Sequence, residues 1–240
     1  MRSPYGMEIV ESCLTCQMRA DHIFCDLPPA ALQSFENIKY AMSYPKGAVL
    51  FVKGQEPRGI FVLCKGSVKL SISATNGKTI IVKIAEPGEV LGLAATVSGK
   101  PYEMTAETID PCQVTFVKRD DFLRFLKDDV EACIKVAEQL SEKYYDACKE
   151  VRSLELSHSA VEKLAKLLLE WSSKNGAAAK PETRLTLRLT HEEISQMIGT
   201  SRETVTRLFA EMKKRQIVQW KGSTLTIRNL AALREIANHN

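Results

Sequence analysis

Short apolar runs separated by glycine, proline and Asn-Gly turns fill residues 45–118, and they constrain the fold more than any other feature. β-branched residues are frequent in these runs, which read PKGAVLFVKG, RGIFVLCKGSVKLSIS and KTIIVKIAEPGEVLG. Asn76-Gly77 lies between two of them and is a strong signal for a β-hairpin. Short strands at roughly ten-residue spacing predict an antiparallel β-roll.

A heptad repeat follows the predicted strands. Its apolar residues lie seven apart in two series offset by three, Val130, Ala137, Tyr144 and Val151, and Cys133, Leu140, Ala147 and Leu154. A repeat of 3.5 residues favours a second helix as the partner, although a long helix packed on its own roll is the alternative. These eight residues therefore predict a long helix with a dimer interface.

Composition and charge narrow the class of protein. Of 240 residues, 45% are hydrophobic and 26% are charged, as in globular proteins with a core. No apolar run approaches the ~18 residues of a membrane span, and the first residues lack the apolar stretch of a signal peptide, so we expect a cytoplasmic protein with no membrane partner. The net charge of +4 is uneven, with +5 from Glu155 onward and −1 before it. Any anionic partner is expected at the C-terminal part.

Two short helical patterns with a glycine between them lie in this basic part. Thr190 and Glu193 fit a capping box, so a helix is expected to begin near His191 and to end at Gly199. Ser201 fits the cap of a second helix. Two such helices predict a helix-turn-helix, and the runs IVQW and TLTI after them predict the two strands of a wing.

The outward face of the second helix is polar at its N-terminal end, which is the end that enters a DNA major groove. Arginine can bind guanine O6 and N7 together, and glutamate can accept from cytosine N4. The alternative is a winged module that contacts protein through a solvated charged face. We predict that double-stranded DNA is contacted by Ser201, Arg202, Glu203, Thr206 and Arg207.

These patterns divide the chain into a cysteine loop with a β-roll (1–126), a dimerisation helix (127–156) and a winged helix-turn-helix domain (157–240). In this order, and most specifically in LTHEEISQMIGTSRETVTRLFAEMKKRQIV, the chain resembles the Crp/Fnr family of bacterial transcription regulators. The resemblance implies an α+β protein with a cupin-like or cyclic-nucleotide-binding-like roll. It also implies a homodimer that binds a palindromic operator, recruits or blocks RNA polymerase, and is not an enzyme. By this resemblance Arg202, Glu203 and Arg207 read a half-site related to TGTGA or TTGAT.

The cysteines suggest what is sensed. Seven is an odd number, which in a cytoplasmic protein argues for free thiols or ligands over a disulfide framework. The oxygen-sensing branch of the family holds a [4Fe–4S] cluster on four cysteines, and the resemblance places this ligand set at Cys13, Cys16, Cys25 and Cys112. Eight residues separate Cys16 from Cys25, whereas the branch has five. The implied signal is oxygen, redox state or nitric oxide.

Other uses of the thiols remain open. The thiols could be exposed surface groups, they could bind zinc together with Cys112 or His22, or they could form a thiol–disulfide switch. In a further alternative the signal is a haem-bound gas or an organic ligand in the roll, and the thiols have no part in sensing. A competitor from another class is a zinc-dependent protein that uses the Cys/His cluster. We interpret Cys64 as a core residue, Cys133 as packing in the dimer seam and Cys148 as inert.

A cyclic nucleotide is not expected in the roll. Members of the family that bind cyclic AMP carry a glutamate for the ribose and an Arg-Ser pair for the phosphate. Leu93 stands where that glutamate would be, and Glu103 and Met104 stand where the pair would be. A buried phosphate needs a cationic partner, and a carboxylate there would repel it.

Overall fold

The computed structural model describes residues 5–6, 9, 12–16, 24–156, 159–174, 183–186, 189–222 and 224–238. Contacts within the chain divide it into two units, residues 1–148 and 149–240. The division falls inside one long helix, α4 (Val130–Leu156). In the described ranges, no helix is both long enough and apolar enough to cross a membrane.

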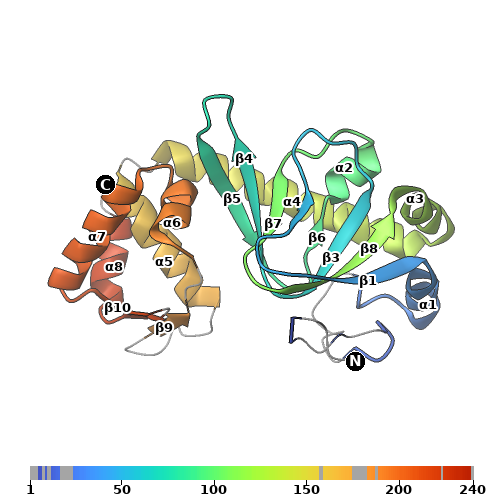
Figure 1. Cartoon of the computed structure of the whole chain (residues 1–240), viewed down its shortest axis with the longest axis horizontal. Coiled ribbons are helices and arrows are strands. Elements are labelled where there is room, and N and C mark those ends of the chain that lie inside the picture. The colour runs from blue at the N-terminus through green and yellow to red at the C-terminus, as the bar shows by residue number, and fades with distance from the viewer. Residues whose placement is uncertain are drawn as a thin grey trace. The chain divides into compact units, whose positions relative to one another are not determined.

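The first unit is built on a β-roll of two four-stranded antiparallel sheets, with strand orders β1-β8-β3-β6 and β2-β7-β4-β5 (Figure 1). The predicted antiparallel roll is therefore confirmed. The strands are β1 (Lys39–Tyr44), β2 (Val49–Phe51), β3 (Gly59–Lys65), β4 (Val68–Ser73), β5 (Thr79–Ala85), β6 (Val90–Leu91), β7 (Thr105–Thr108) and β8 (Cys112–Lys118).

The predicted Asn-Gly hairpin joins β4 to β5. Ser73 faces Thr79 across the strand pair, and the Ala74 N–H donates to the Lys78 carbonyl at 2.9 Å. Gly77 has a φ of 80°, a backbone conformation that residues with a Cβ adopt only at a cost. Glycine at this position therefore allows the tight turn.

Helix α2 (Leu93–Ser98) lies within the region for which the sequence predicted only strands. Gly92 and Gly99 flank it, and both have a φ of 72°. These left-handed residues turn the chain into and out of a short helix between β6 and β7. Their glycines were read as strand punctuation, so the prediction was wrong for these six residues.

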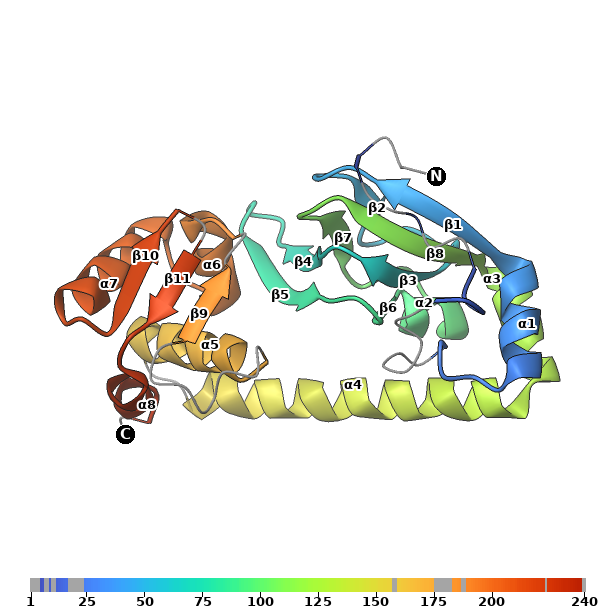
Figure 2. The same cartoon turned by 90° about the horizontal axis from the view of Figure 1, so that it is seen from below.

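Helices α1 (Pro29–Ile38) and α3 (Arg119–Asp128) pack together beside the roll (Figure 2). Phe24 joins them, because its ring stacks on Phe35 at 5.3 Å between centroids and meets the edge of Phe122 at 5.7 Å. The sequence analysis assigned no helix to either segment. Burial of these rings anchors the chain directly before Cys25.

Helix α4 confirms the predicted long helix and presents two faces. Its inner face buries Ala132, Val136 and Gln139. The outer face exposes the predicted seam residues Val130, Cys133, Ala137, Tyr144 and Ala147, with Val130 at 74% and Tyr144 at 73%. The other three predicted seam residues are Leu140, Val151 and Leu154. Leu140 is half-buried against the core of its own chain, and the side chains of Val151 and Leu154 lie outside the described residues.

The second unit contains the predicted helix-turn-helix and wing. Its sheet has the order β10-β11-β9, and α5 packs against α8. The elements are α5 (Ala160–Lys174), β9 (Thr183–Thr186), α6 (His191–Ile198), α7 (Arg202–Lys214), β10 (Val218–Lys221), β11 (Thr224–Ile227) and α8 (Leu230–Ala237). Strand β9, which pairs with β11, is an element that the sequence analysis did not predict.

Local signals set the boundaries of the helix-turn-helix as predicted. The Thr190 side chain accepts from the Glu193 N–H, and the Glu193 carboxylate accepts from the Thr190 N–H, which completes a capping box. Gly199 ends α6 at a φ of 68°, and the Ser201 hydroxyl then caps α7. The inner faces of both helices enter one apolar core with Leu164 and Leu168 of α5.

We predict that Gly66→Ala lowers the free energy of unfolding more than Gly77→Ala does. Both glycines have left-handed backbones, at φ +90° and +80°, so each substitution costs about 1–2 kcal/mol. Only at Gly66 would the new Cβ meet the Pro111 carbonyl oxygen, at 2.5 Å, and Cys112 Sγ, at 2.6 Å. This overpacking adds about 1–3 kcal/mol. Urea unfolding of the two variants gives the comparison, and equal losses would show that the contact is relieved without cost.

Candidate functional site

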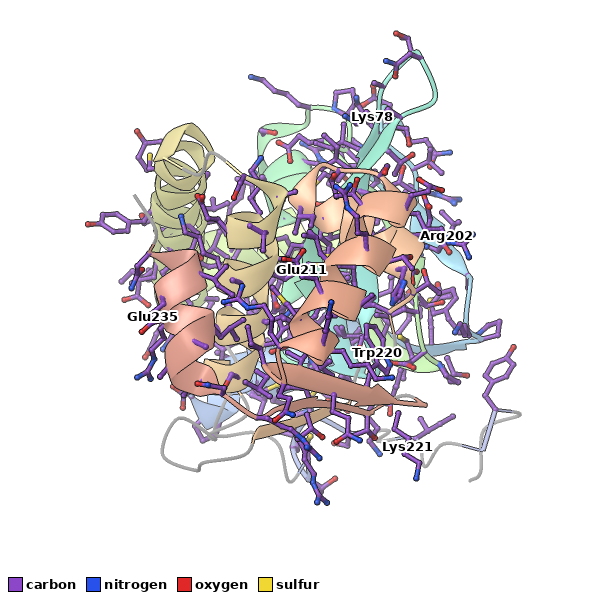
Figure 3. The ribbon with its side chains drawn as sticks, turned by 90° about the vertical axis from the view of Figure 1, so that its left-hand side faces the viewer. Lys78, Arg202, Glu211, Trp220, Lys221 and Glu235 are labelled. Atoms are coloured by element: carbon purple, nitrogen blue, oxygen red, sulfur yellow. The ribbon has the colours of Figure 1, made fainter. Side chains whose placement is uncertain are left out.

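The N-terminal end of α7 exposes every residue predicted to contact DNA. Its inward face buries Val205, Leu208, Phe209 and Met212 in the core of the unit. Exposed on the other side are the five predicted residues, Ser201, Arg202, Glu203, Thr206 and Arg207. Figure 3 shows Arg202 at this end of the helix, on the same side of the unit as Trp220 of the wing.

Glu203 is held ionised at this end of the helix. Hydrogen bonds from its own backbone N–H and from the Ser201 side chain lower the pKa of Glu203 below its ordinary value. An ionised carboxylate has acceptor sites only. Glu203 therefore matches a base that offers an amino group, such as cytosine, and it mismatches the acceptor edge of guanine.

The roll places its two cysteines on opposite faces of the sheet that contains β3 and β8. Cys112 begins β8 and points into the roll, where it packs in the same cluster as Leu63 and Val114. Its side chain is fully buried, and its Sγ donates to the Asp110 carbonyl at 3.2 Å and to the Ser67 carbonyl at 3.4 Å.

Cys64 lies on the other face, because side chains alternate along a strand. Ile60 and Val62 of the same strand enter the cluster that α1 and α3 cover. Cys64 Sγ lies 3.4 Å from Thr115 Oγ1 of β8. Cys13 packs against this cluster too, so the N-terminal segment meets the Cys64 face of the sheet.

Burial keeps the thiols of Cys13 and Cys64 neutral at physiological pH. Burial raises the pKa of Cys13 to about 11, and the Cys64 charge contributes in the same direction. Burial also raises the pKa of Cys64, with a contribution from Cys16. Lys39 opposes both shifts, and its ammonium pairs with Glu36 at 3.4 Å. The Glu36 carboxylate also accepts the Cys13 N–H at 2.9 Å, which fixes the segment to α1.

The structure thus places Cys13 on the face of the sheet that carries Cys64, and it does not bring the four predicted cluster ligands together. Over the described residues, no three or more Cys, His, Asp or Glu side chains are arranged to hold a metal ion. Cys25 is half-buried, and His22 lies outside the described residues. The sequence analysis interpreted Cys64 as a core residue and did not count it among the candidate ligands. Cys64 directly follows Leu63, which faces into the roll, and side chains alternate along a strand. This alternation was the signal that Cys64 faces outward from the roll.

The place expected for a cyclic nucleotide presents an apolar and an acidic side chain. Leu93 is 1% exposed and has no group that can bind a ribose hydroxyl, and Glu103 is exposed to solvent. Tyr102 stacks on Phe51 with ring centroids 4.1 Å apart, and its hydroxyl donates to the Gly59 carbonyl at 2.9 Å. Lys143 of α4 also reaches this region, since its Nζ donates to the Val90 carbonyl at 2.8 Å. Burial lowers the pKa of Lys143.

Comparisons with known proteins match both units. A cyclic nucleotide-binding domain family matches residues 41–129, and a Crp-like helix-turn-helix domain family matches residues 162–236. A CRP-like cAMP-activated global transcriptional regulator of Mycobacterium tuberculosis is 24% identical over 205 residues, which is 85% of this chain and 91% of that protein. The transcriptional activatory protein AadR of Rhodopseudomonas palustris is 24% identical over 203 residues, covering 85% and 83%.

Solved structures show the same fold. FixK2 from Bradyrhizobium japonicum superposes with a TM-score of 0.72 at 22% identity, covering 85% of this chain and 99% of that one. A complex of CprK with the ligand OCPA superposes with a TM-score of 0.65 at 18% identity, covering 87% and 94%.

We predict that Cys13 reacts slowly with iodoacetamide in metal-free protein at pH 8. A thiol with a pKa of about 11 is ionised to roughly 0.1% there, whereas an ordinary thiol with a pKa near 8.5 is ionised to roughly a quarter. Allowing for the higher nucleophilicity of the more basic thiolate, we expect a rate at least roughly tenfold below that of the exposed Cys148, which lies off the predicted dimer seam. Peptide mass spectrometry over time measures each site in one sample. Equal rates would contradict the burial of Cys13.

Proposed function

Because the chain belongs to the Crp/Fnr family of transcription regulators, we propose that it is a homodimeric cytoplasmic regulator whose signal enters at the N-terminal thiols. The chain is not an enzyme, since the family acts by binding DNA. One observation carries the DNA-binding role, namely the exposed polar end of a helix whose other face is fully packed. The expected partners are a palindromic operator and RNA polymerase.

Each recognition helix reads one half-site of the operator through its exposed end. Arg202 and Arg207 are suited to guanine, whose O6 and N7 accept two hydrogen bonds from one guanidinium. Glu203 accepts from cytosine, because hydrogen bonds from its own backbone N–H and from Ser201 lower its pKa and favour the ionised carboxylate. This set fits a half-site related to TGTGA or TTGAT. Thr206 is the position at which the choice between the two is made.

The outer face of α4 supplies the dimer interface. Val130, Ala137 and Tyr144 are exposed in the single chain, as is Ile134 at 53%, which the heptad pattern did not include. A face with this much exposed apolar surface is suited to a second copy of the same helix. Paired α4 helices would set two recognition helices about one DNA turn apart, which is roughly 34 Å.

The signal is oxygen, redox state or nitric oxide. Relatives named for activation by cAMP share the roll, but Leu93 and the exposed Glu103 replace the groups that a cyclic nucleotide needs. For a [4Fe–4S] cluster on Cys13, Cys16, Cys25 and Cys112, the described arrangement does not fit, because Cys112 points into the roll. We therefore derive no step through a cluster. The input is proposed at Cys13, Cys16 and Cys64, where the N-terminal segment meets the roll.

We predict that Arg207→Ala weakens operator binding by about 1–3 kcal/mol and relaxes the preference at one base pair of each half-site. The reason is loss of a two-pronged contact with guanine. Glu211→Ala is the matched control, because Glu211 is exposed two turns from the same end of α7. Competition binding at fixed salt measures both variants. Unchanged DNA affinity in Arg207→Ala would contradict the proposed DNA-reading face.

A second prediction concerns the signal. Operator affinity of the reduced protein should differ at least about fivefold from that of protein exposed to air or to diamide. Cys16→Ser and Cys64→Ser should suppress this difference, because they remove thiols at the proposed input. Cys148→Ser should preserve it, since that thiol is exposed elsewhere.

Cys112→Ser decides between thiol chemistry and the cluster. We expect this variant to respond as the wild type does, and anaerobically purified protein to lack bound iron and sulfide. Loss of the response in Cys112→Ser, together with roughly four irons and four sulfides per wild-type chain, would instead establish the [4Fe–4S] ligand set. An unaltered response in Cys16→Ser would place the signal away from the N-terminal thiols.

A further inference from the structure

The hydroxyl group of Thr206 is held between two groups of the protein. Its Oγ1 donates to the Arg202 carbonyl oxygen at 2.9 Å, one turn back on α7, and it lies 2.9 Å from His191 Nδ1 on α6. A hydroxyl has one proton and two acceptor sites. Since the proton of Thr206 is directed to Arg202, the nitrogen of His191 must be the donor. One acceptor site of the exposed oxygen is then left for DNA.

Aromatic packing fixes the ring of His191 behind the recognition helix. The ring stacks on Phe209 with centroids 5.3 Å apart at an interplanar angle of 15°, and it meets the edge of Trp220 at 5.0 Å. Trp220, which is labelled in Figure 3, is held in turn by the wing, because its Nε1 donates to the Gly222 carbonyl at 2.7 Å. The imidazole therefore has little freedom to turn away from Thr206.

Two features favour the neutral form of the ring. Burial and the nearby charge of Arg202 both lower the pKa of His191 below 6.5. At neutral pH the ring then carries a single proton, and the hydrogen bond to Thr206 places it on Nδ1. This assignment agrees with the direction of the hydrogen bond from Thr206 to Arg202.

We propose that His191 is a positioning residue that, with the Arg202 carbonyl, presents Thr206 Oγ1 to the operator as an acceptor only. The facing base would then be adenine or cytosine, whose major-groove edges offer an amino group. Guanine would bring acceptors against an acceptor. The inference rests on the proposed reading of DNA by α7, and it names a specificity determinant that lies outside that helix.

A purely structural role for His191 leads to a different expectation. As the first residue of α6, packed on Phe209 and Trp220, it would stabilise the unit and nothing more. Its loss would then weaken binding to every operator by the same factor. The discriminating quantity is therefore the base preference at one position, measured beside the affinity for the whole site.

The experiment uses the full chain and a set of operators that carry each base at each half-site position. Thr206→Val, which removes only the hydroxyl, identifies the position that Thr206 reads. There we expect the wild type to prefer adenine or cytosine over guanine by roughly five- to fiftyfold. His191→Phe retains a ring for stacking but has no donor, and it should reduce this preference several-fold at that position alone.

His191→Asn is the matched rescue, because the side-chain amide can donate from a place close to that of Nδ1. It should retain most of the preference. In a Thr206→Val background, His191→Phe should have no further effect on base preference, since the two residues act through one hydroxyl. His191→Leu, which also lacks a donor, replaces His191→Phe if that variant does not fold by circular dichroism.

Two results would overturn the inference alone. They are a wild-type preference retained in the donor-free variant, or an equal loss of affinity on all operators. A folded wild type with no base preference at any position would overturn the proposed reading of DNA as well. The two failures are therefore distinguishable in one data set.

Discussion

The antiparallel pairing of β3 with β8 is the constraint on which the first unit depends. It sends alternate side chains to two separate cores, one inside the roll and one under α1 and α3. Each strand therefore contributes to both cores, and neither face can change without the other. The same alternation gives Cys64 and Cys112 different surroundings, although their strands are neighbours in one sheet.

In the second unit, the exposed N-terminal end of α7 is held in place by contacts with α6 and the wing. The capping box at Thr190 fixes the start of α6, and the ring of the next residue, His191, bridges to α7 and to the wing. The side chains proposed to contact DNA are thus oriented by packing on the other side of α7. Such support lowers the entropy lost on binding, because the reading groups are already ordered.

The sequence was most informative where structure is encoded locally. Caps at Thr190 and Ser201, the glycine at 199 and the Asn-Gly hairpin all act within a few residues, so their elements were predicted with correct types and nearly correct ends. Helix α2 and strand β9 depend on distant partners and were missed. Leu140 shows the same limit, because a heptad pattern does not distinguish apolar residues that pack in the core of their own chain from those that face a partner helix. The face of the sheet on which Cys64 lies depends on the alternation of side chains along β3, and the spacing between cysteines does not reveal it.

The register of β3 against β8 shifts between Leu63 and Lys65, at the position of Cys64. A strand that slips by one residue exchanges its inward and outward side chains. Insertion or loss of one residue here would turn Cys64 into the roll. The input proposed at Cys64 therefore depends on the register of one strand pair as well as on the cysteine itself.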